Sequence, residues 1–177
     1  MQFSKNTLLR FQIFSVIFTW ILGTILHFTY DWSNQNAIVG AFSAINESTW
    51  EHLKLLFFPM LITTIIGYFY LKPKKEYKNF LCAKTIGILV ALAFVIVFFY
   101  TYTGIIGTNF AILDIGSFFV GVFLGEYTAY KLTNKISGCK NGLAAFILIV
   151  LFICFIVFTY NAPQIGLFRD PLSNINK

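Results

Sequence analysis

The chain has 177 residues, of which 58% are hydrophobic and only 11% are charged. Soluble domains carry about 25% charged residues, so this composition excludes a soluble enzyme, a nucleic-acid-binding domain and a disordered protein. The net charge of +6 therefore needs an explanation other than nucleic acid. The composition is that of an integral membrane protein in a lipid bilayer.

Five stretches are long and apolar enough to cross a membrane, since a helix needs about 20 apolar residues to span about 30 Å of hydrocarbon. None of them alternates between apolar and polar residues, as the strands of a membrane barrel would. We therefore predict an all-α integral membrane protein, with one transmembrane domain over residues 1–177 and a bundle of five transmembrane helices. The predicted spans are residues 11–30, 53–71, 85–106, 110–130 and 143–160.

The basic residues predict the orientation, because cytoplasmic loops are enriched in Lys and Arg. With the N-terminus in the cytoplasm, only Lys54, Arg169 and Lys177 of the thirteen basic residues face outward. We expect a cytoplasmic N-terminus, an external C-terminus and a first span that is retained rather than cleaved. The abundance of Phe, Ile, Asn and Lys is typical of a bacterial protein, which places it in the plasma membrane. The residues expected inside are Lys5, Arg10, Lys72, Lys74, Lys75, Lys78, Lys84, Lys131, Lys135 and Lys140.

The three cysteines agree with this orientation. Cys82 and Cys139 fall on the predicted cytoplasmic side, and Cys154 lies within the fifth span. No extracytoplasmic disulfide is therefore expected, and the thiols are expected in a reducing environment.

The long segment between the first two spans contains a further apolar stretch, residues 37–45. It is too short to cross the membrane. We expect a short helix that lies at the outer interface or re-enters the bundle.

Polar chemistry is concentrated at the predicted outer face. Five of the seven acidic residues and both histidines fall there, whereas only Glu76 and Glu126 belong to the inner half. Acidic residues contribute little to orientation, so their position needs another explanation. The outer residues are His27, Asp31, Glu47, Glu51, His52, Asp114 and Asp170, with Arg169 beside the last of them.

Helical spacing and antiparallel packing bring several of these residues together. His27 and Asp31 are four residues apart and share a helix face. The first span ends where the second begins, so His27 can approach His52. Asp114, near the outer end of the fourth span, is costly in hydrocarbon without a partner. We predict an outward-facing polar pocket.

Each of these residues also has a local interpretation. Ser48 and Glu51 have the spacing of a helix capping box, and Glu51 with Lys54 has that of a surface ion pair. Glu126 can extend toward the inner surface beside Lys131. Small residues four apart favour close helix packing, within the chain or between copies, at Gly121 and Gly125.

Three motifs at the outer face resemble those of a known family. They are HFTYDWS at residues 27–33, NESTWEHLK at 46–54 and FRDP at 168–171. The family consists of small bacterial multi-spanning membrane proteins of unknown function, with the patterns HFxY(D/E)WS, NESxWEHLK and FxDP. The resemblance implies a shared architecture and a role for the outer motifs, but no activity. Residues 172–177 depart from the family pattern.

A metal site is one function that these residues permit. Zinc is bound by His nitrogens and carboxylate oxygens, and an open fourth position would activate water for hydrolysis at the outer leaflet. The candidate ligands are His27, His52, Glu51 and Asp114. Haem held between the two histidines is less compatible with the surrounding acids.

Two other functions remain open. The pocket would bind a small polar or cationic solute, with a partner membrane subunit or a second copy of the chain. Alternatively, the polar residues form a closed hydrogen-bond network that fixes the packing of an accessory protein without a ligand. Binding of a small solute or metal ion is the interpretation we favour from the sequence.

Overall fold

The computed structural model describes residues 2–71, 77, 79–135 and 138–170, with side chains from Asn6 onward. Within these ranges the regular structure is entirely helical. Five helices are long and apolar enough to cross a membrane, as the sequence predicts. They are α1 (Gln2–Trp32), α3 (Thr49–Leu71), α4 (Phe80–Ile106), α5 (Ala111–Thr133) and α6 (Asn141–Tyr160).

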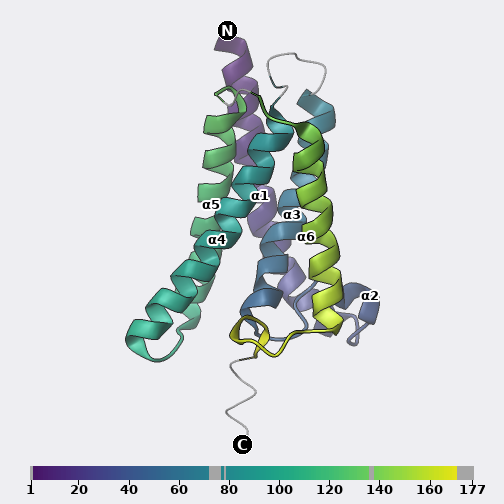
Figure 1. The fold of residues 1–177 in the computed structure, drawn as a ribbon, viewed down its shortest axis with the longest axis vertical. Coiled ribbons are helices and arrows are strands. Elements are labelled where there is room, and N and C mark those ends of the chain that lie inside the picture. Colours follow the sequence, from purple (N-terminus) through teal and green to yellow (C-terminus); the bar gives the residue numbers. More distant parts are fainter. Residues whose placement is uncertain (1, 72–76, 78, 136–137, 171–177) are drawn as a thin grey trace, which may run out of the picture.

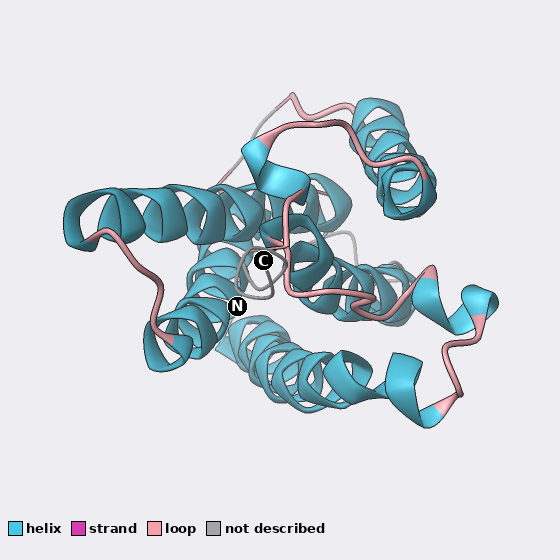
Figure 2. Ribbon diagram, turned by 90° about the horizontal axis from the view of Figure 1, so that it is seen from below, coloured by secondary structure: helices cyan, strands magenta, loops and turns pink. Residues whose placement is uncertain are grey.

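The helices run alternately up and down and pack as a bundle (Figure 1). We call the end that holds the starts of α1, α4 and α6 the lysine end, and the opposite end the histidine end. In Figure 1 the lysine end is at the top, and the lower parts of α4 and α5 run together away from α3 and α6. Seen from the histidine end, loops cross this face, and the short helix α2 (Ala37–Gly40) lies toward its edge (Figures 1 and 2).

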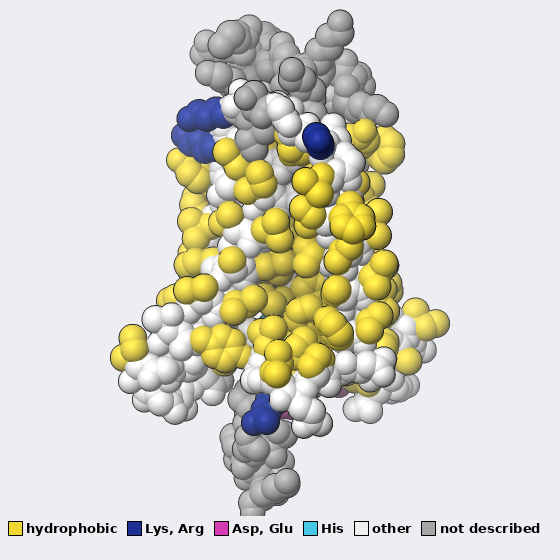
Figure 3. Space-filling view, viewed as in Figure 1, with side chains coloured by type: hydrophobic (Ala, Val, Ile, Leu, Met, Phe, Trp, Pro, Cys, Tyr) yellow, Lys and Arg dark blue, Asp and Glu magenta, His cyan; other side chains and the backbone are white. Residues whose placement is uncertain are grey.

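The sides of the bundle expose apolar side chains, as contact with lipid requires. Ile13, Ile17 and Ile21 project from α1, and Ile149 and Ile153 from α6, each about half exposed. Figure 3 shows this apolar surface along the length of the visible face, with Lys and Arg gathered toward the ends. The interior is also apolar, with a core that includes Leu56, Phe57, Met60, Ile88, Val122 and Phe155.

Only part of the charge pattern used to predict orientation falls within the described residues. Lys131, Lys135 and Lys140 are exposed at the lysine end. Lys72, Lys74, Lys75, Lys78, Lys177, Glu76 and the side chain of Lys5 lie outside the described part of the chain. The orientation in the membrane therefore stays a prediction.

Lys84 differs from the loop residue that the sequence suggests. Helix α4 begins at Phe80, and Lys84 is fully buried one turn inside it. Its ammonium group pairs with Glu126 on α5 at 2.5 Å. Glu126 therefore does not extend to the surface beside Lys131, whose own ammonium lies 5.2 Å from the centre of the Tyr127 ring.

Glycines set the close packing of α4 against α5. A Cβ atom at Gly125 would lie 2.6 Å from the carbonyl oxygen of Gly87, and one at Gly121 would lie 3.0 Å from the Val95 side chain. Only a residue without a side chain permits this approach of two backbones. Both predicted packing glycines thus face α4 of the same chain.

The segment between α1 and α3 is tied to α1 and α6. The Asn36 side chain caps α2 by accepting a hydrogen bond from the Ile38 amide at 2.9 Å. Ser43 then accepts one from the Tyr30 amide at 3.1 Å, and the Tyr160 hydroxyl donates to the Ala37 carbonyl. The helix ends at Gly40, earlier than the apolar stretch 37–45 suggests, and the remaining residues form turns.

The expectation of reduced thiols is wrong for two of the three cysteines. A disulfide at the lysine end joins Cys82, on α4, to Cys139, just before α6, with a Cα–Cα distance of 6.4 Å. The sequence suggested free thiols here, because it does not show that the start of α4 lies beside the connection from α5 to α6. Cys154 is free.

Candidate metal centre

The antiparallel packing of α1 and α3 brings the two histidines together at the histidine end. His27 lies near the end of α1, and His52 lies in the first turn of α3. The centroids of their rings are 5.3 Å apart. Helix α3 begins at Thr49, four residues before the predicted span, so His52 is held by helical backbone rather than by a loop.

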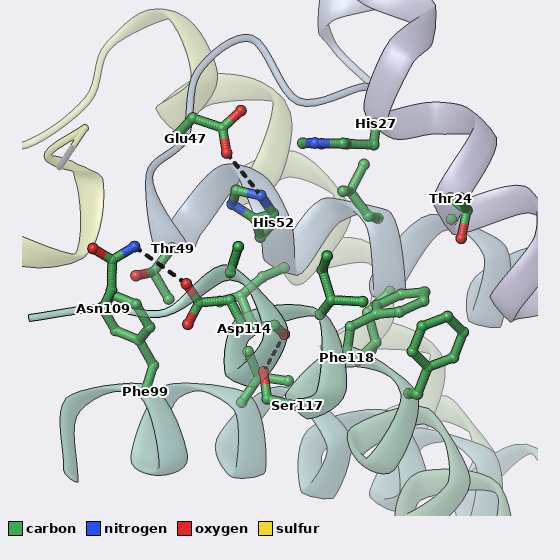
Figure 4. A pocket seen from close by; sticks show the side chains of 18 of the residues that line it. Thr24, His27, Glu47, Thr49, His52, Phe99, Asn109, Asp114, Ser117 and Phe118 are labelled. Atoms are coloured by element: carbon green, nitrogen blue, oxygen red, sulfur yellow. Dashed lines mark hydrogen bonds and ion pairs between the residues drawn. The ribbon is translucent and has the colours of Figure 1, made fainter. Parts of the chain in front are cut away.

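The turn before α3 places Glu47 beside these rings. The Asn46 side chain accepts a hydrogen bond from the Ser48 amide at 2.9 Å, and the Ser48 hydroxyl accepts one from the Glu51 amide at 3.4 Å. These bonds start the helix and leave the Glu47 carboxylate next to His52 (Figure 4). Only one of the two hydrogen bonds of the predicted capping box forms, because the Ser48 amide donates to the Asn46 side chain and not to that of Glu51.

The hydrogen bonds of His52 define which of its nitrogens is available. Its Nδ1 lies 3.0 Å from the Ser48 carbonyl oxygen. A carbonyl only accepts, so Nδ1 carries a proton and donates it. The other nitrogen, Nε2, lies 3.4 Å from Oε2 of Glu47. When the ring is neutral, Nε2 has a lone pair that faces a carboxylate, so the two atoms need something positive between them, either a proton on Nε2 or a metal ion.

His27 completes a group of three possible ligands. Its Nδ1 is buried and has no hydrogen-bond partner among the described residues. One ligand atom each from His27, Glu47 and His52 lie within 4.8 Å of one another. In the described part of the chain these three side chains are the ones arranged to hold a metal ion.

Glu47 is about half exposed and lies outside the spanning helices. The hydrogen bond from His52 holds the pKa of Glu47 below its ordinary value, against the opposing effect of partial burial. The charges of His52 and His27 act in the same direction as the hydrogen bond. Glu47 is therefore a carboxylate, the form that coordinates a cation, through a wider acid range than an isolated glutamate.

A cavity of about 450 Å³ adjoins this group and extends between α1, α3, α4 and α5. Figure 4 shows His27, Glu47 and His52 on one side of it, with Asn109, Asp114 and Ser117 across from them. Most of the rest of the wall is apolar and includes Phe28, Leu53, Leu56, Val95, Phe99, Ile115, Phe118 and Phe119. The pocket is thus polar at the histidine end and apolar deeper in the bundle.

Asp114 lies in the first turn of α5 and has donors of its own. The Tyr102 hydroxyl donates to its Oδ1, and the Asn109 amide donates to its Oδ2 at 3.2 Å. These two neutral donors give each carboxylate oxygen a hydrogen bond without a metal ion. The structure places Asp114 on the opposite wall of the cavity, apart from the group of three.

Glu51 also lies apart from the histidines, in a buried network. Its Oε2 is 2.6 Å from the ammonium of Lys54 and accepts a hydrogen bond from the Ile45 amide at 3.0 Å. Lys54 donates further to the Gly40 carbonyl at 2.7 Å and the Thr159 hydroxyl at 2.8 Å. The suggested surface pair is instead a buried ion pair, because Thr159 and the segment after α2 cover it.

The remaining candidates are not part of the group. Asp31 is exposed on the last turn of α1, and Arg169 and Asp170 follow the short helix η2 (Gly166–Phe168). None of the three lines the cavity. The tail packs through Phe168 instead, whose ring lies 4.8 Å from that of Trp50.

The sequence indicates both histidines but not which carboxylate joins them. Glu47 lies five residues before His52 and Glu51 lies one residue before it, so neither has the spacing of three or four residues that pairs side chains on a helix. Helical spacing therefore does not choose between them. Only the burial of Lys54 removes Glu51 from the choice, since an exposed lysine would leave that carboxylate free. The contacts of the Lys54 side chain are not visible in a single sequence.

Comparison with known proteins identifies the family but no activity. A family model, described as a family of unknown function (DUF6512), matches residues 1–175. No curated protein matches the chain. No solved structure matches it either.

Proposed function

We propose a function for this chain, which belongs to the family of unknown function DUF6512: it is an integral membrane protein that binds a divalent metal ion. The ligands are His27, Glu47 and His52. They line a pocket that, in the predicted orientation, opens to the outside of a bacterial plasma membrane. Binding at this pocket is the function we assign.

One observation carries the proposal. The Nε2 atom of His52 faces Oε2 of Glu47 at 3.4 Å, while the Nδ1 proton of the same ring is committed to the Ser48 carbonyl. Ligating histidines characteristically donate their second ring N–H to a carbonyl or carboxylate, which fixes the ring for the metal. A metal ion at this point would satisfy Nε2, the carboxylate and the nearby His27 ring together.

The ligand set favours zinc. Two imidazoles and one carboxylate form a set that zinc sites commonly use, and three protein ligands leave a fourth position for water or another ligand. Calcium and magnesium prefer a shell made only of oxygen atoms. Haem is not supported, because Glu47 lies within 4.8 Å of both histidines, where its charge would oppose the propionates.

The test is elemental analysis of the purified full-length chain. We expect about one zinc ion per chain, and loss of that metal in His27→Ala, Glu47→Gln and His52→Ala. Removing a direct ligand should lower the affinity by more than the 10–100-fold typical of an outer-shell partner. Asp31→Asn is the matched control, because it removes an acid at the end of α1 outside the group and should keep the metal.

Absence of metal in the wild type, after reconstitution with zinc, would contradict the proposal. The arrangement of the three side chains would then be explained by a protonated His52 that forms an ion pair with Glu47. In that case the pocket would be tested with small organic cations, and Asp114→Asn would be the first variant. Unchanged zinc content in all three ligand variants would equally exclude the site.

A metal-dependent hydrolase at the outer leaflet is a second candidate, favoured by the cavity. The open coordination position would face a space of about 450 Å³ whose deeper wall is apolar, as a lipid chain would require. A zinc-bound water is acidic enough to act as a nucleophile near neutral pH. Hydrolysis of short-chain esters that depends on zinc and is lost in Glu47→Gln would support this candidate; zinc binding without turnover would exclude it for those esters.

A further inference from the structure

A second polar group lies deep in the bundle, far from the candidate metal centre. The Lys84 ammonium donates to Glu126 Oε1 at 2.5 Å and to the Thr63 hydroxyl at 3.2 Å. Lys84 is 0% exposed and Glu126 is 1% exposed. Both lie in membrane-spanning helices, where ionisable side chains are costly and commonly mark ion pathways or proton relays.

This pair differs from the other buried ion pair in one respect. Lys54 uses all three ammonium protons, on Glu51, Gly40 and Thr159, so that pair is closed. Among the described residues, the ammonium of Lys84 has two partners and Oε2 of Glu126 has none. A buried carboxylate oxygen without a donor costs several kcal/mol in hydrocarbon. The Lys84–Glu126 pair is therefore open to a hydrogen-bonding occupant.

Helix α1 contributes more unsatisfied polar atoms. Gln12, Ser15 and Thr19 follow one another at spacings of three and four, so they share one face of the helix. All three are at most 4% exposed. Both polar atoms of the Gln12 amide and both hydroxyls lack a hydrogen-bond partner in the described part of the chain.

The helix packing places this face at the level of the ion pair. The Phe11 ring meets Gly67, and Gly23 meets both the Leu55 carbonyl and the Phe118 ring. Helix α1 runs antiparallel to α3 and α5. Counting eight residues back from Gly23 along α1 therefore reaches the same depth in the bundle as counting eight residues forward from Leu55 along α3 or from Phe118 along α5. Ser15 is therefore level with Thr63 and with Glu126, in the interior of the bundle.

The same face of α1 leads on to the metal pocket. From Thr19, steps of four residues reach Gly23 and then His27, which both line the cavity. At Gly23 the helices pack tightly, because a Cβ atom there would lie 2.6 Å from the Phe118 ring and 2.5 Å from the Leu55 carbonyl. This close contact lies between the buried polar group and the pocket along α1.

We propose that Gln12, Ser15, Thr19, Lys84 and Glu126 form a second site, which binds water and carries protons between the lysine end and the pocket. The side chains of Gln12, Ser15 and Thr19 provide the donors and acceptors that hold the water. Phe118, packed against Gly23, blocks the path while no proton is being transferred. This site is independent of whether the pocket binds metal.

The proton step is an exchange between the two charged groups. The Lys84 ammonium transfers a proton to Glu126 Oε1, so an N–H bond breaks, an O–H bond forms and both groups become neutral. The Glu126 carboxyl group then rotates about its Cγ–Cδ bond, so that the protonated oxygen takes the place of Oε2, and it releases the proton to water, which becomes hydronium. Lys84 takes a proton from hydronium supplied at the lysine end, which restores the ion pair. One proton enters and one leaves, and nothing is oxidised or reduced.

The test is proton flux into liposomes that contain the full-length chain and an entrapped pH-sensitive dye, driven by a potassium diffusion potential without added metal. We expect the proton flux with the wild type to exceed that of protein-free liposomes. Glu126→Gln should lower the flux at least tenfold, to the level of the protein-free liposomes. Ser15→Ala with Thr19→Val should lower the flux several-fold, and Phe118→Ala should raise it.

Thr64→Val is the matched control. Thr64 is also buried, but its hydroxyl donates to the Met60 carbonyl of its own helix at 2.7 Å, so its loss should leave the flux unchanged. Helix content and a single size-exclusion peak identify variants that fold. Wild-type flux equal to that of empty liposomes, or full flux in folded Ser15→Ala/Thr19→Val, would overturn the proposal.

Discussion

At the scale of single residues, burial separates lysines that look alike in the sequence. Lys54 and Lys84 each follow a stretch of chain between spans, as an exposed topological lysine does, yet both are 0% exposed and paired with glutamate. A buried pair contributes little net stability, but removing one partner leaves an uncompensated charge. The two pairs therefore respond sharply to single substitutions.

We expect Lys54→Met to destabilise the folded protein by about 3–5 kcal/mol, because it leaves Glu51 buried without its cation. The double variant Glu51→Leu/Lys54→Met should recover part of this loss, since no charge remains. Lys140→Met changes an exposed lysine and should lie within about 0.5 kcal/mol of the wild type. Denaturant unfolding in detergent measures all three, and equal losses in the single and double variants would contradict the buried pair.

The proposed metal site predicts a pH dependence of zinc affinity. Both histidines must be neutral to bind, and an ordinary histidine titrates near pH 6.5. Affinity should therefore fall as the pH falls, by up to about 100-fold per pH unit once both histidines are protonated. Isothermal titration with zinc between pH 5.5 and 7.5 measures the slope.

Glu47 should not contribute to that slope. Its pKa is lowered by the hydrogen bond from His52, so it stays ionised through this window, and its contribution to the folded state is lost only in more acidic solution. Glu47→Gln should lower affinity without changing the slope, whereas His52→Ala should reduce the slope by about half. A flatter slope in Glu47→Gln would assign the titration to the carboxylate instead.

At the scale of helices, the α4–α5 contact depends on the absence of two side chains. Gly125→Ala places a Cβ atom 2.6 Å from the Gly87 carbonyl, and a backbone atom cannot give way cheaply. We expect destabilisation of about 1–3 kcal/mol from overpacking. Thermal unfolding in detergent, followed by circular dichroism, tests this.

Gly116→Ala provides the control on the same helix. A Cβ atom at Gly116 meets nothing within 4 Å, so alanine should be neutral or should stabilise α5 by up to about 1 kcal/mol through its higher helix propensity. Equal effects at positions 116 and 125 would mean that propensity, rather than the contact with α4, determines both results.

At the scale of the whole molecule, the distribution of charge predicts which end faces outward. In a chain with Cys154→Ala, Gln164→Cys marks the histidine end and Asn134→Cys marks the lysine end, both at exposed positions. An impermeant thiol reagent on intact cells should label position 164, and should label position 134 only after permeabilisation. The reverse pattern would place the candidate metal centre on the cytoplasmic side.

Much of the fold was predictable from the sequence because the bilayer imposes strong constraints. Spans must be long, apolar and helical, so five such stretches predict five helices, and the structure contains them. Their ends were less predictable, since α3 and α4 begin several residues before the apolar stretches. The first turns of α3 and α4 contain polar residues that form ion pairs or hydrogen bonds. Because these residues lower the local hydropathy, the apolar stretch begins later than the helix does.

The sequence by itself determined the membrane setting, the helix count and the end at which the histidines gather. Only the tertiary structure decided the partners. It pairs Glu51 with Lys54, Glu126 with Lys84 and Cys82 with Cys139, and it leaves Glu47 beside the two histidines. Hydropathy depends on each residue and its neighbours along the chain. The choice of partner instead depends on helix register and rotation, which are set by glycine contacts and packing between residues far apart in the chain.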